Sequence, residues 1–385
     1  MKKIRALIAD DSFFMRKVLS QLLTSDPNIE IVASAKNGKE AVELVKEHQP
    51  DVVTMDIEMP IMNGIEALKT IMTETPVPVI MVSSLTTEGA QFTMDALSIG
   101  AVDFIAKRQG FGSGETDGMK EELLEKIHIV ASSFTIRRRM ERLRRQKTGI
   151  TAEPTAPAAL LKRVRPPASA VTTSRTAIRP PHSHFKIAII GVSTGGPLAL
   201  HQIIPRLPAN LPVPLLIVQH MPPYFTKSLS DRLNGVSQVE VVEAADGMVL
   251  QPGHVYIAPG GLQMLIDAGN RIHISQEKYD TLYKPSVDVT VRSVVQHFGG
   301  RALGIIMTGM GRDGAASLKE LLASGGYVIA QNEDTCVVYG MPRAVVEDGT
   351  ANEIHSLENL AEVISACLGC HFVLPEVTRP AVRNS

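Results

Sequence analysis

The sequence predicts an α/β protein of two domains. Its 385 residues, 44% of them apolar, are enough for two hydrophobic cores. Short apolar runs alternate with amphipathic stretches in two separate blocks, the pattern of strands alternating with helices. A basic stretch rich in proline separates the blocks. We therefore expect a domain over residues 1–130, a linker over 131–185, a second domain over 186–375 and a tail over 376–385.

The first block contains five strand-helix units, which predict a flavodoxin-like, doubly wound parallel sheet. Right-handed crossovers bring the loops that follow the strands to one edge of such a sheet. The strands are expected at 4–10, 30–35, 51–56, 77–84 and 102–107, and the helices at 13–23, 40–48, 64–72 and 88–99.

Five polar residues stand where strands of this first block end. Asp10 and Asp11 end the first strand, Asp56 the third, Ser83 the fourth and Lys107 the fifth. Three carboxylates in one cleft suit a hard divalent cation such as Mg²⁺. A cation and a lysine ammonium together can neutralise phosphoryl oxygens while a carboxylate attacks. A single acid at a strand end would be read as merely solvated, but the five together indicate a site.

This constellation resembles the receiver domain of two-component response regulators, and the segment MDIEMPIMNG around Asp56 is similar to that family too. The resemblance implies that Asp56 accepts a phosphoryl group and that Asp10, Asp11 and Asp56 bind Mg²⁺. It also implies that Ser83 senses the phosphoryl group and that Lys107 contacts it.

The second block predicts a Rossmann-like α/β domain with some antiparallel strands. Apolar runs such as LLIV and LGIIM suit parallel strands that are buried on both faces. A hairpin is expected from HVYIAPGGLQMLI followed by RIHISQ. The other strands are expected at 187–192, 215–220, 239–244, 302–309 and 327–332, and the helices from about 196 to 207, 224 to 234, 287 to 299 and 315 to 325.

The segment KIAIIGVSTGGPLAL ends a strand in a Gly-x-Ser-x-Gly pattern centred on Ser193. Gly191 and Gly195 permit a sharp turn that exposes the serine hydroxyl, and Pro197 suits the first turn of a helix. The pattern alone is equally compatible with a capping serine or with a glycine-rich phosphate loop. A dinucleotide site would require an acid at the end of the next strand, which instead ends in Gln219 and His220.

A serine nucleophile requires a base, usually a histidine that is held by a third group. Of the five candidate histidines His201, His220, His254, His273 and His297, only His220 stands at the carboxyl end of an expected parallel strand. Asp313 follows another such strand in the loop GMGRDGAA. Ser193, His220 and Asp313 are therefore predicted to share one edge of the sheet, although a turn aspartate before glycine is also a common structural role.

The second block resembles the chemotaxis protein-glutamate methylesterase family, known as CheB. The similar segments are GVSTGGP, VQHMP, IAPGG, KPSVDV, TGMGRDGA and AQNEDTCVVYGMP. The resemblance implies that Ser193 is the nucleophile, His220 the general base and acid, and Asp313 the carboxylate that orients it. It also implies an oxyanion hole formed by the backbone amides of Thr194 and Met310.

Three residues depart from the family patterns. Arg108 replaces the proline that usually follows the receiver lysine, and Gln263 stands where the segment IAPGG often continues to a histidine. Cys336 stands where serine is common. We expect these changes to affect loop shape or substrate fit and to leave the triad unchanged.

The resemblance implies an enzyme controlled by phosphorylation. It would hydrolyse glutamate methyl esters on the cytoplasmic domains of methylated chemoreceptors, release methanol and deamidate receptor glutamines. A chemotaxis histidine kinase would be the phosphodonor, with Mg²⁺ for receiver phosphorylation and no cofactor for the esterase reaction.

Cysteine content and hydropathy indicate a cytoplasmic protein without membrane insertion. Three cysteines are too few for a disulfide framework, and the chain begins without a signal sequence. Two other functions remain open. The arginine run at 137–147 would suit a receiver-controlled transcription factor, although we expect no nucleic-acid partner, and GVSTGGP could serve as an anion nest in a binding module.

Overall fold

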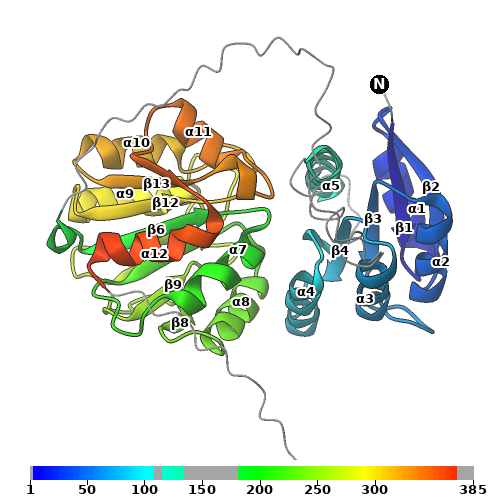
Figure 1. Ribbon diagram of the computed structural model, residues 1–385, viewed down its shortest axis with the longest axis horizontal. Coiled ribbons are helices and arrows are strands. Elements are labelled where there is room, and N and C mark those ends of the chain that lie inside the picture. Colours follow the sequence, from blue (N-terminus) through cyan, green and yellow to red (C-terminus); the bar gives the residue numbers. More distant parts are fainter. Residues whose placement is uncertain (1–2, 108–114, 134–180, 371–385) are drawn as a thin grey trace, which may run out of the picture.

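The computed structural model describes residues 3–107, 115–133 and 181–370, which form two α/β domains (Figure 1). Most of the expected linker, the expected tail and Arg108 lie outside the described residues. Within these ranges no helix combines the length and the apolar character needed to cross a bilayer. The two-domain α/β class predicted from the sequence is confirmed.

The first domain has helices on both faces of a parallel sheet. Its strands have the order β2-β1-β3-β4-β5 among the described residues, which is the flavodoxin-like order. The elements are β1 (Ile4–Ala9), α1 (Phe13–Thr24), β2 (Ile29–Ala35), α2 (Gly38–His48), β3 (Val52–Asp56), α3 (Gly64–Glu74), β4 (Val79–Ser84), α4 (Thr87–Ile99), β5 (Asp103–Lys107) and α5 (Glu115–Ser132).

The second domain is larger and is also built on a parallel sheet, with the order β14-β13-β12-β6-β7-β9-β8 in its described part. Its elements are η1 (His182–His184), β6 (Ile187–Val192), α7 (Gly196–Ile203), η2 (Ile204–Arg206), β7 (Leu215–Gln219), α8 (Phe225–Asn234), β8 (Glu240–Glu243), β9 (His254–Ile257), β10 (Gln263–Ile266), β11 (Ile272–Ser275), α9 (Val287–Phe298), β12 (Ala302–Ile306), α10 (Ala315–Ala323), β13 (Tyr327–Gln331), η3 (Glu333–Thr335), α11 (Met341–Glu347), β14 (Glu353–His355) and α12 (Leu357–Leu368).

The expected hairpin is only partly correct. β10 and β11 do pair as antiparallel strands. The segment HVYI, however, forms β9, which pairs in parallel with both β7 and β8 in the main sheet. The proline and two glycines after it therefore end a sheet strand and lead out to the small hairpin, instead of forming the hairpin's own turn.

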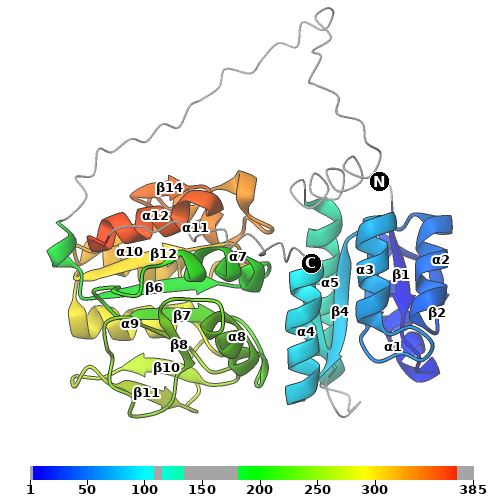
Figure 2. The same cartoon turned by 60° about the horizontal axis from the view of Figure 1, so that its bottom comes forward.

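The domains contact each other through α4 of the first and the helices α7 and α8 of the second (Figure 2). Between β5 and α8, the rings of Phe104 and Phe225 stack with centroids 4.5 Å apart. Arg232 on α8 pairs with Asp95 on α4 and donates to Ser98 Oγ at 3.0 Å. An aromatic stack with polar contacts at its side thus joins the two domains.

Candidate functional site

Ser193, His220 and Asp313 follow three neighbouring strands of the second sheet. β6 lies between β7 and β12, and the three residues follow β6, β7 and β12 respectively. The strand order reverses at β6, because β7 lies on one side of it and β12 on the other. The carboxyl edge at β6 is therefore a topological switch point, where open α/β sheets bind ligands. The structure therefore brings the three residues predicted from the sequence to one edge.

The turn at Ser193 is as tight as its glycines suggest. Ser193 O accepts a hydrogen bond from Gly196 N at 2.8 Å, and Ser193 N donates to Thr308 O at 3.0 Å. Gly195 has φ +77°, and a side chain there would collide with Val337. The serine is thereby fixed between β6 and α7, with its backbone held by the loop that follows β12.

Asp313 is a buried carboxylate that accepts four hydrogen bonds. Its donors are His220 Nε2 at 2.7 Å, Val287 N at 2.7 Å, Ser286 Oγ at 2.9 Å and Asp288 N at 3.0 Å. Burial favours the neutral acid, but the bond and charge of His220 and the amides at the start of α9 together lower the pKa of Asp313. Asp313 is therefore an anion at neutral pH, stabilised by a helix N-terminus.

The bond to Asp313 determines which nitrogen of His220 can act as a base. Nε2 faces the carboxylate and must carry a proton to donate to it. Nδ1 is buried and has no hydrogen-bond partner among the described residues. Ser193 Oγ forms no hydrogen bond with it in the same part of the chain, and such contacts are often long before substrate binds. The neutral imidazole thus keeps its lone pair on Nδ1.

The backbone amides of Thr194 and Met310 donate no hydrogen bond within the described chain. Thr194 is held in place because its carbonyl accepts from Thr308 Oγ1 at 2.9 Å. Both residues line the same cavity as Ser193 and His220. Two free N–H groups beside a serine are suited to stabilising an oxyanion.

That cavity, of about 530 Å³, lies between the two domains. The second domain contributes the serine, the histidine and the two residues with free amides. The first domain contributes residues of β5 and α5, among them Phe104, Glu125 and Lys126. The receiver-like domain therefore forms one wall of the candidate active site.

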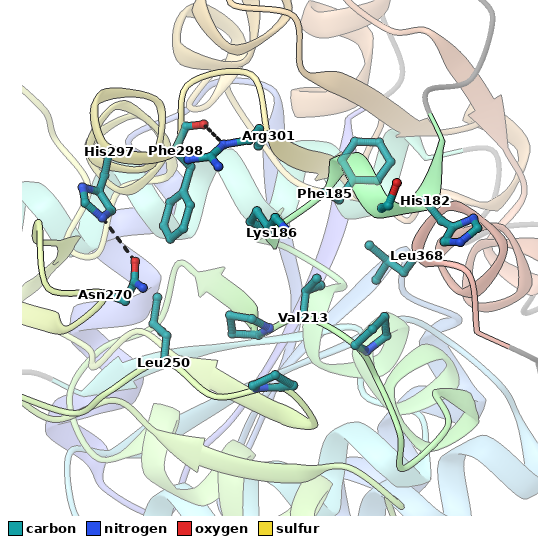
Figure 3. Close-up of a pocket in the computed structure, with 14 residues that line it drawn as sticks. His182, Phe185, Lys186, Val213, Leu250, Asn270, His297, Phe298, Arg301 and Leu368 are labelled. Atoms are coloured by element: carbon teal, nitrogen blue, oxygen red, sulfur yellow. Dashed lines mark hydrogen bonds between the residues drawn. The ribbon is translucent and has the colours of Figure 1, made fainter.

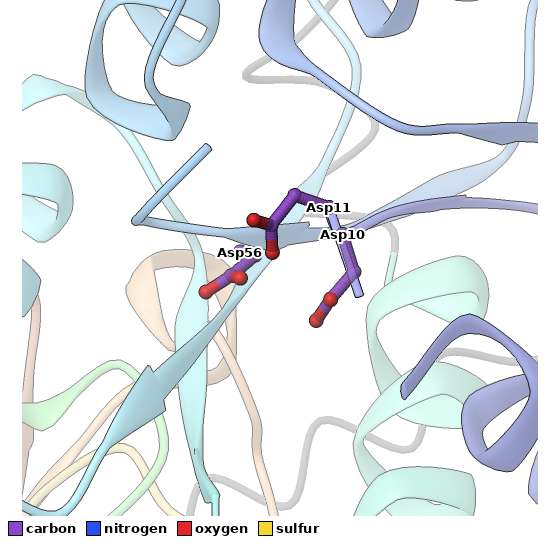
Figure 4. Close-up of side chains that lie close together, drawn as sticks. All are labelled: Asp10, Asp11 and Asp56. Atoms are coloured by element: carbon purple, nitrogen blue, oxygen red, sulfur yellow. The ribbon is translucent and has the colours of Figure 1, made fainter. Parts of the chain in front are cut away.

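A second cluster occupies the carboxyl edge of the first sheet (Figure 4). Ligand oxygens of Asp10, Asp11 and Asp56 all lie within 4.8 Å of one another. Lys107 Nζ lies 2.7 Å from Asp56 Oδ2 and 3.1 Å from Asp10 Oδ2. Ser83 lines one small cavity together with Asp56 and Lys107. Its hydroxyl donates to Gly89 O at 3.0 Å. All five residues predicted from the strand ends meet here.

The carboxylates of this cluster are incompletely neutralised. Burial raises the pKa of Asp56 to about 6, and the charge of Asp10 adds to this, while Lys107 opposes the rise. Asp10 Oδ2 is buried, and in the described part of the chain Lys107 Nζ, at 3.1 Å, is the one partner given for it. A cluster of three carboxylates that shares a single lysine ammonium fits a hard divalent cation.

Another cavity, of about 590 Å³, opens at the opposite edge of the second sheet (Figure 3). It is lined by Lys186 and Arg301, which directly precede β6 and β12. His297 contacts Asn270 Oδ1 at 3.2 Å. No residue of the Ser193 cluster lines this cavity, so we assign it no part in the chemistry.

Three residues around the candidate triad were given no role in it by the sequence reasoning. Ser286 holds Asp313, Tyr283 stacks on His220 with ring centroids 4.2 Å apart, and Gln263 holds the segment between them. The segment KPSVDV contains Ser286 but carries no chemical signal of its own. The only signal for Gln263 was its departure from histidine.

Together the two domains define a response regulator whose output domain is an enzyme. The response regulator receiver domain family matches residues 6–113, and the CheB methylesterase family matches residues 188–364. The matched ranges fall within the two domains expected from the sequence, whose boundaries stay predictions.

Curated relatives match nearly the whole chain. The protein-glutamate methylesterase/protein-glutamine glutaminase of Symbiobacterium thermophilum is 45% identical over 96% of this chain and 98% of its own length. The protein-glutamate methylesterase/protein-glutamine glutaminase 1 of Oleidesulfovibrio alaskensis is 43% identical over 94% of this chain and 98% of its own length. The crystal structure of the Thermotoga maritima CheB methylesterase catalytic domain is 40% identical, covering 47% of this chain and 97% of that domain, with a TM-score of 0.45. The chain belongs to the CheB protein-glutamate methylesterase family.

Proposed function

We propose that Ser193, His220 and Asp313 form the catalytic triad of a protein-glutamate methylesterase and protein-glutamine glutaminase that phosphorylation regulates. The observation that carries this proposal is the bond between Asp313 and His220 Nε2, which leaves Nδ1 as the free base at the edge where Ser193 stands. Family membership supplies the substrate class, a γ-carboxyl methyl ester or amide.

In the first half-reaction, Ser193 Oγ attacks the carbonyl carbon of the glutamate ester while His220 Nδ1 takes its proton. The imidazolium that forms lies beside the ionised Asp313, which stabilises it. The carbonyl oxygen becomes an oxyanion, and the amides of Thr194 and Met310 are its donors. Nδ1 then returns the proton to the leaving oxygen, methanol departs, and an acyl-enzyme ester remains on Ser193.

In the second half-reaction, a water molecule attacks the acyl-enzyme, and His220 Nδ1 accepts the water's proton. The same oxyanion donors serve again. Collapse of the intermediate breaks the bond to Ser193 Oγ, which recovers its proton from His220, and a glutamate carboxylate is released. With a glutamine substrate the steps are the same except that ammonia leaves in place of methanol.

The receiver domain supplies the regulation. Asp56 attacks the phosphorus of a phosphohistidine on an upstream kinase, the N–P bond breaks, and an aspartyl phosphate forms. Asp10, Asp11 and Asp56 would hold a Mg²⁺ ion, which would neutralise charge on the transferring phosphoryl group. Lys107 lies close enough to Asp56 to contact the phosphoryl oxygens, and Ser83 would turn from Gly89 O to bind them.

Phosphorylation would act by moving the receiver away from the esterase. The wall that β5 and α5 contribute to the Ser193 cavity restricts the approach of a receptor segment. β5 carries both Lys107, at the phosphorylation site, and Phe104, at the domain contact. A shift of β5 on phosphorylation would therefore reach the interface directly, as a two-state domain rearrangement.

The partners follow from this chemistry. The substrates would be methylated chemoreceptor domains, the phosphodonor a chemotaxis histidine kinase, and the place of action the cytoplasm, where both are exposed. We propose no nucleic-acid partner, because an enzymatic output domain already accounts for the receiver; the arginine run at 137–147 lies outside the described residues.

The proposal is tested by methanol release from a methylated receptor fragment. Ser193→Ala should lower the turnover number by at least about 10⁴-fold, because the nucleophile is lost. Ser237→Ala, a serine of the same domain in the loop after α8, serves as the matched control and should retain wild-type turnover. Substantial turnover by Ser193→Ala would refute the triad.

A further inference from the structure

Tyr283 covers one face of the His220 ring. The two rings are nearly parallel, at 6°, with centroids 4.2 Å apart. The tyrosine hydroxyl packs against Gly311, where even a methyl group would approach it to 2.7 Å. The ring of Tyr283 therefore spans the distance from the imidazole to the turn that presents the amide of Met310.

A fully buried amide holds Tyr283 in this position. Gln263, at the start of β10, has no exposed surface. Its Nε2 donates to Tyr283 O at 2.8 Å, and its Oε1 accepts from Ser286 N at 2.9 Å. Gly261 N adds a third bond, to Lys284 O at 3.1 Å. The segment 283–286 is thus attached along its length to the start of the small hairpin.

The same segment also holds Asp313. Ser286 Oγ and Val287 N both donate to its carboxylate. One short segment therefore sets the ring that stacks on His220 and the anion that binds its Nε2. The hydrogen bond from Nε2 to Asp313 restrains the imidazole ring of His220 at one atom only, and rotation about χ2 of a histidine is otherwise broad. Stacking on Tyr283 removes that rotation.

We propose that Tyr283 and Gln263 are positioning residues for His220: Tyr283 holds the imidazole plane so that Nδ1 faces Ser193, and Gln263 holds Tyr283. The inference rests on the proposed triad. The electron-rich face of Tyr283 also favours the imidazolium formed during attack. The role of Gln263 requires one donor and one acceptor at once, which a neutral histidine also offers, so both residue types are compatible with this position.

The test compares Tyr283→Leu with the conservative Tyr283→Phe in the full chain, by methanol release as a function of pH. Tyr283→Leu should lower kcat about tenfold or more at unchanged KM, since a misdirected base slows the chemical step. It should also move the acid limb of the pH profile to lower pH by about 0.5 unit, because the imidazolium loses a favourable ring face. Tyr283→Phe should recover both properties to within about twofold.

The charged groups that line the cavity are the same in every variant: Asp103, Glu121, Glu122, Glu125, Lys126 and Lys284. A wild-type kcat and profile for Tyr283→Leu would overturn the proposal. So would a rise in KM alone, which would make Tyr283 a substrate contact, or an equal loss in Tyr283→Phe, which would assign the effect to the hydroxyl.

If Tyr283→Leu does not fold, a second pair decides. Gln263→His should keep most of the turnover, whereas Gln263→Leu, which can neither donate nor accept, should lose about tenfold in kcat. Equal turnover in the two variants would contradict the proposal. The Ser193→Ala variant reports separately on the triad, because it loses turnover whether or not Tyr283 positions the base.

Discussion

The two sites of this chain place carboxylates at the same kind of position, the carboxyl ends of parallel strands, and treat them in opposite ways. Asp313 receives four hydrogen bonds and its pKa is lowered. Asp56 is buried beside Asp10 and its pKa is raised to about 6. The protein itself supplies the hydrogen-bond donors for the esterase carboxylate. The receiver carboxylates, in contrast, have too little positive charge around them to balance their own negative charge.

This difference corresponds to the two roles. A carboxylate that orients a histidine must stay in place and stay ionised, so internal donors from a helix N-terminus suit it. A carboxylate that accepts a phosphoryl group must remain reactive, and the charge it lacks is left for a cation and the phosphodonor to bring. In the proposed mechanism, the receiver cluster is therefore the variable site, whose charge changes on phosphorylation, and the triad is the constant site that it controls.

The largest expected effect is on the constant site. Asp313→Asn should lower kcat for methanol release by about 10³- to 10⁴-fold, because the amide no longer holds the required tautomer or stabilises the imidazolium. Asp246→Asn, an exposed acid of the same domain, is the control and should behave as wild type. A loss of less than tenfold in Asp313→Asn would mean that the four donors serve structure alone.

The variable site should matter only when a phosphodonor is present. Wild-type turnover should rise about 5-fold or more with Mg²⁺ and a small acyl phosphate, a coupling typical of regulated proteins. Asp56→Ala should show no rise at all, while Glu43→Ala, an exposed acid on α2, should respond normally. Equal stimulation of Asp56→Ala and wild type would place the switch elsewhere.

The contact between the domains should have a smaller effect. Arg232→Asp breaks the ion pair with Asp95 and places two acids together. Basal turnover without phosphodonor should rise by about 2- to 5-fold, the range expected for an exposed ion pair. Adding Asp95→Arg restores opposite charges and should return turnover toward wild type. A rise that persists in the double variant would remove this pair from the inhibitory contact.

The smallest effects concern stability, measured by calorimetry without divalent cations. Since the folded pKa of Asp56 is above its unfolded value, its ionisation costs stability as pH rises from about 4 to 6. Asp56→Asn should therefore raise the free energy of unfolding of the receiver domain by about 1–3 kcal/mol at pH 7, and hardly change it at pH 4.

Asp313 has a lowered pKa, so the stability that its ionised carboxylate contributes is present above about pH 4 and is lost in stronger acid. Asp313→Asn should lower the free energy of unfolding of the esterase domain at pH 7. A change of the same sign in Asp56→Asn and Asp313→Asn would contradict the comparison.

Much of both sites could be predicted from the sequence, because strand-end position is a local property. Asp10, Asp56 and Lys107 each follow a recognisable apolar run, and parallel strands bring such ends together. His220 and Asp313 were found by the same argument. Where the pattern was ambiguous, as for HVYI, the error came from pairing: a strand that joins the main sheet between β7 and β8 has the same local pattern as one arm of a hairpin.

The residues that the sequence did not predict act through tertiary contacts. Tyr283 and Gln263 lie 20 residues apart and meet only because the small hairpin folds back onto the segment before α9. Residues of α5 and Ser193 line one cavity although they belong to two domains that the linker separates in the sequence. Neither arrangement follows from periodicity or from a motif.

The most direct test of the central claim is to locate the nucleophile. After incubation with a serine-directed phosphonate, peptide mass mapping should find a single adduct, on Ser193, formed in step with the loss of methanol release. The adduct should be absent in Ser193→Ala and should form much more slowly in Asp313→Asn. Complete loss of activity with the adduct on another residue, or full labelling of Ser193 with activity retained, would contradict the account.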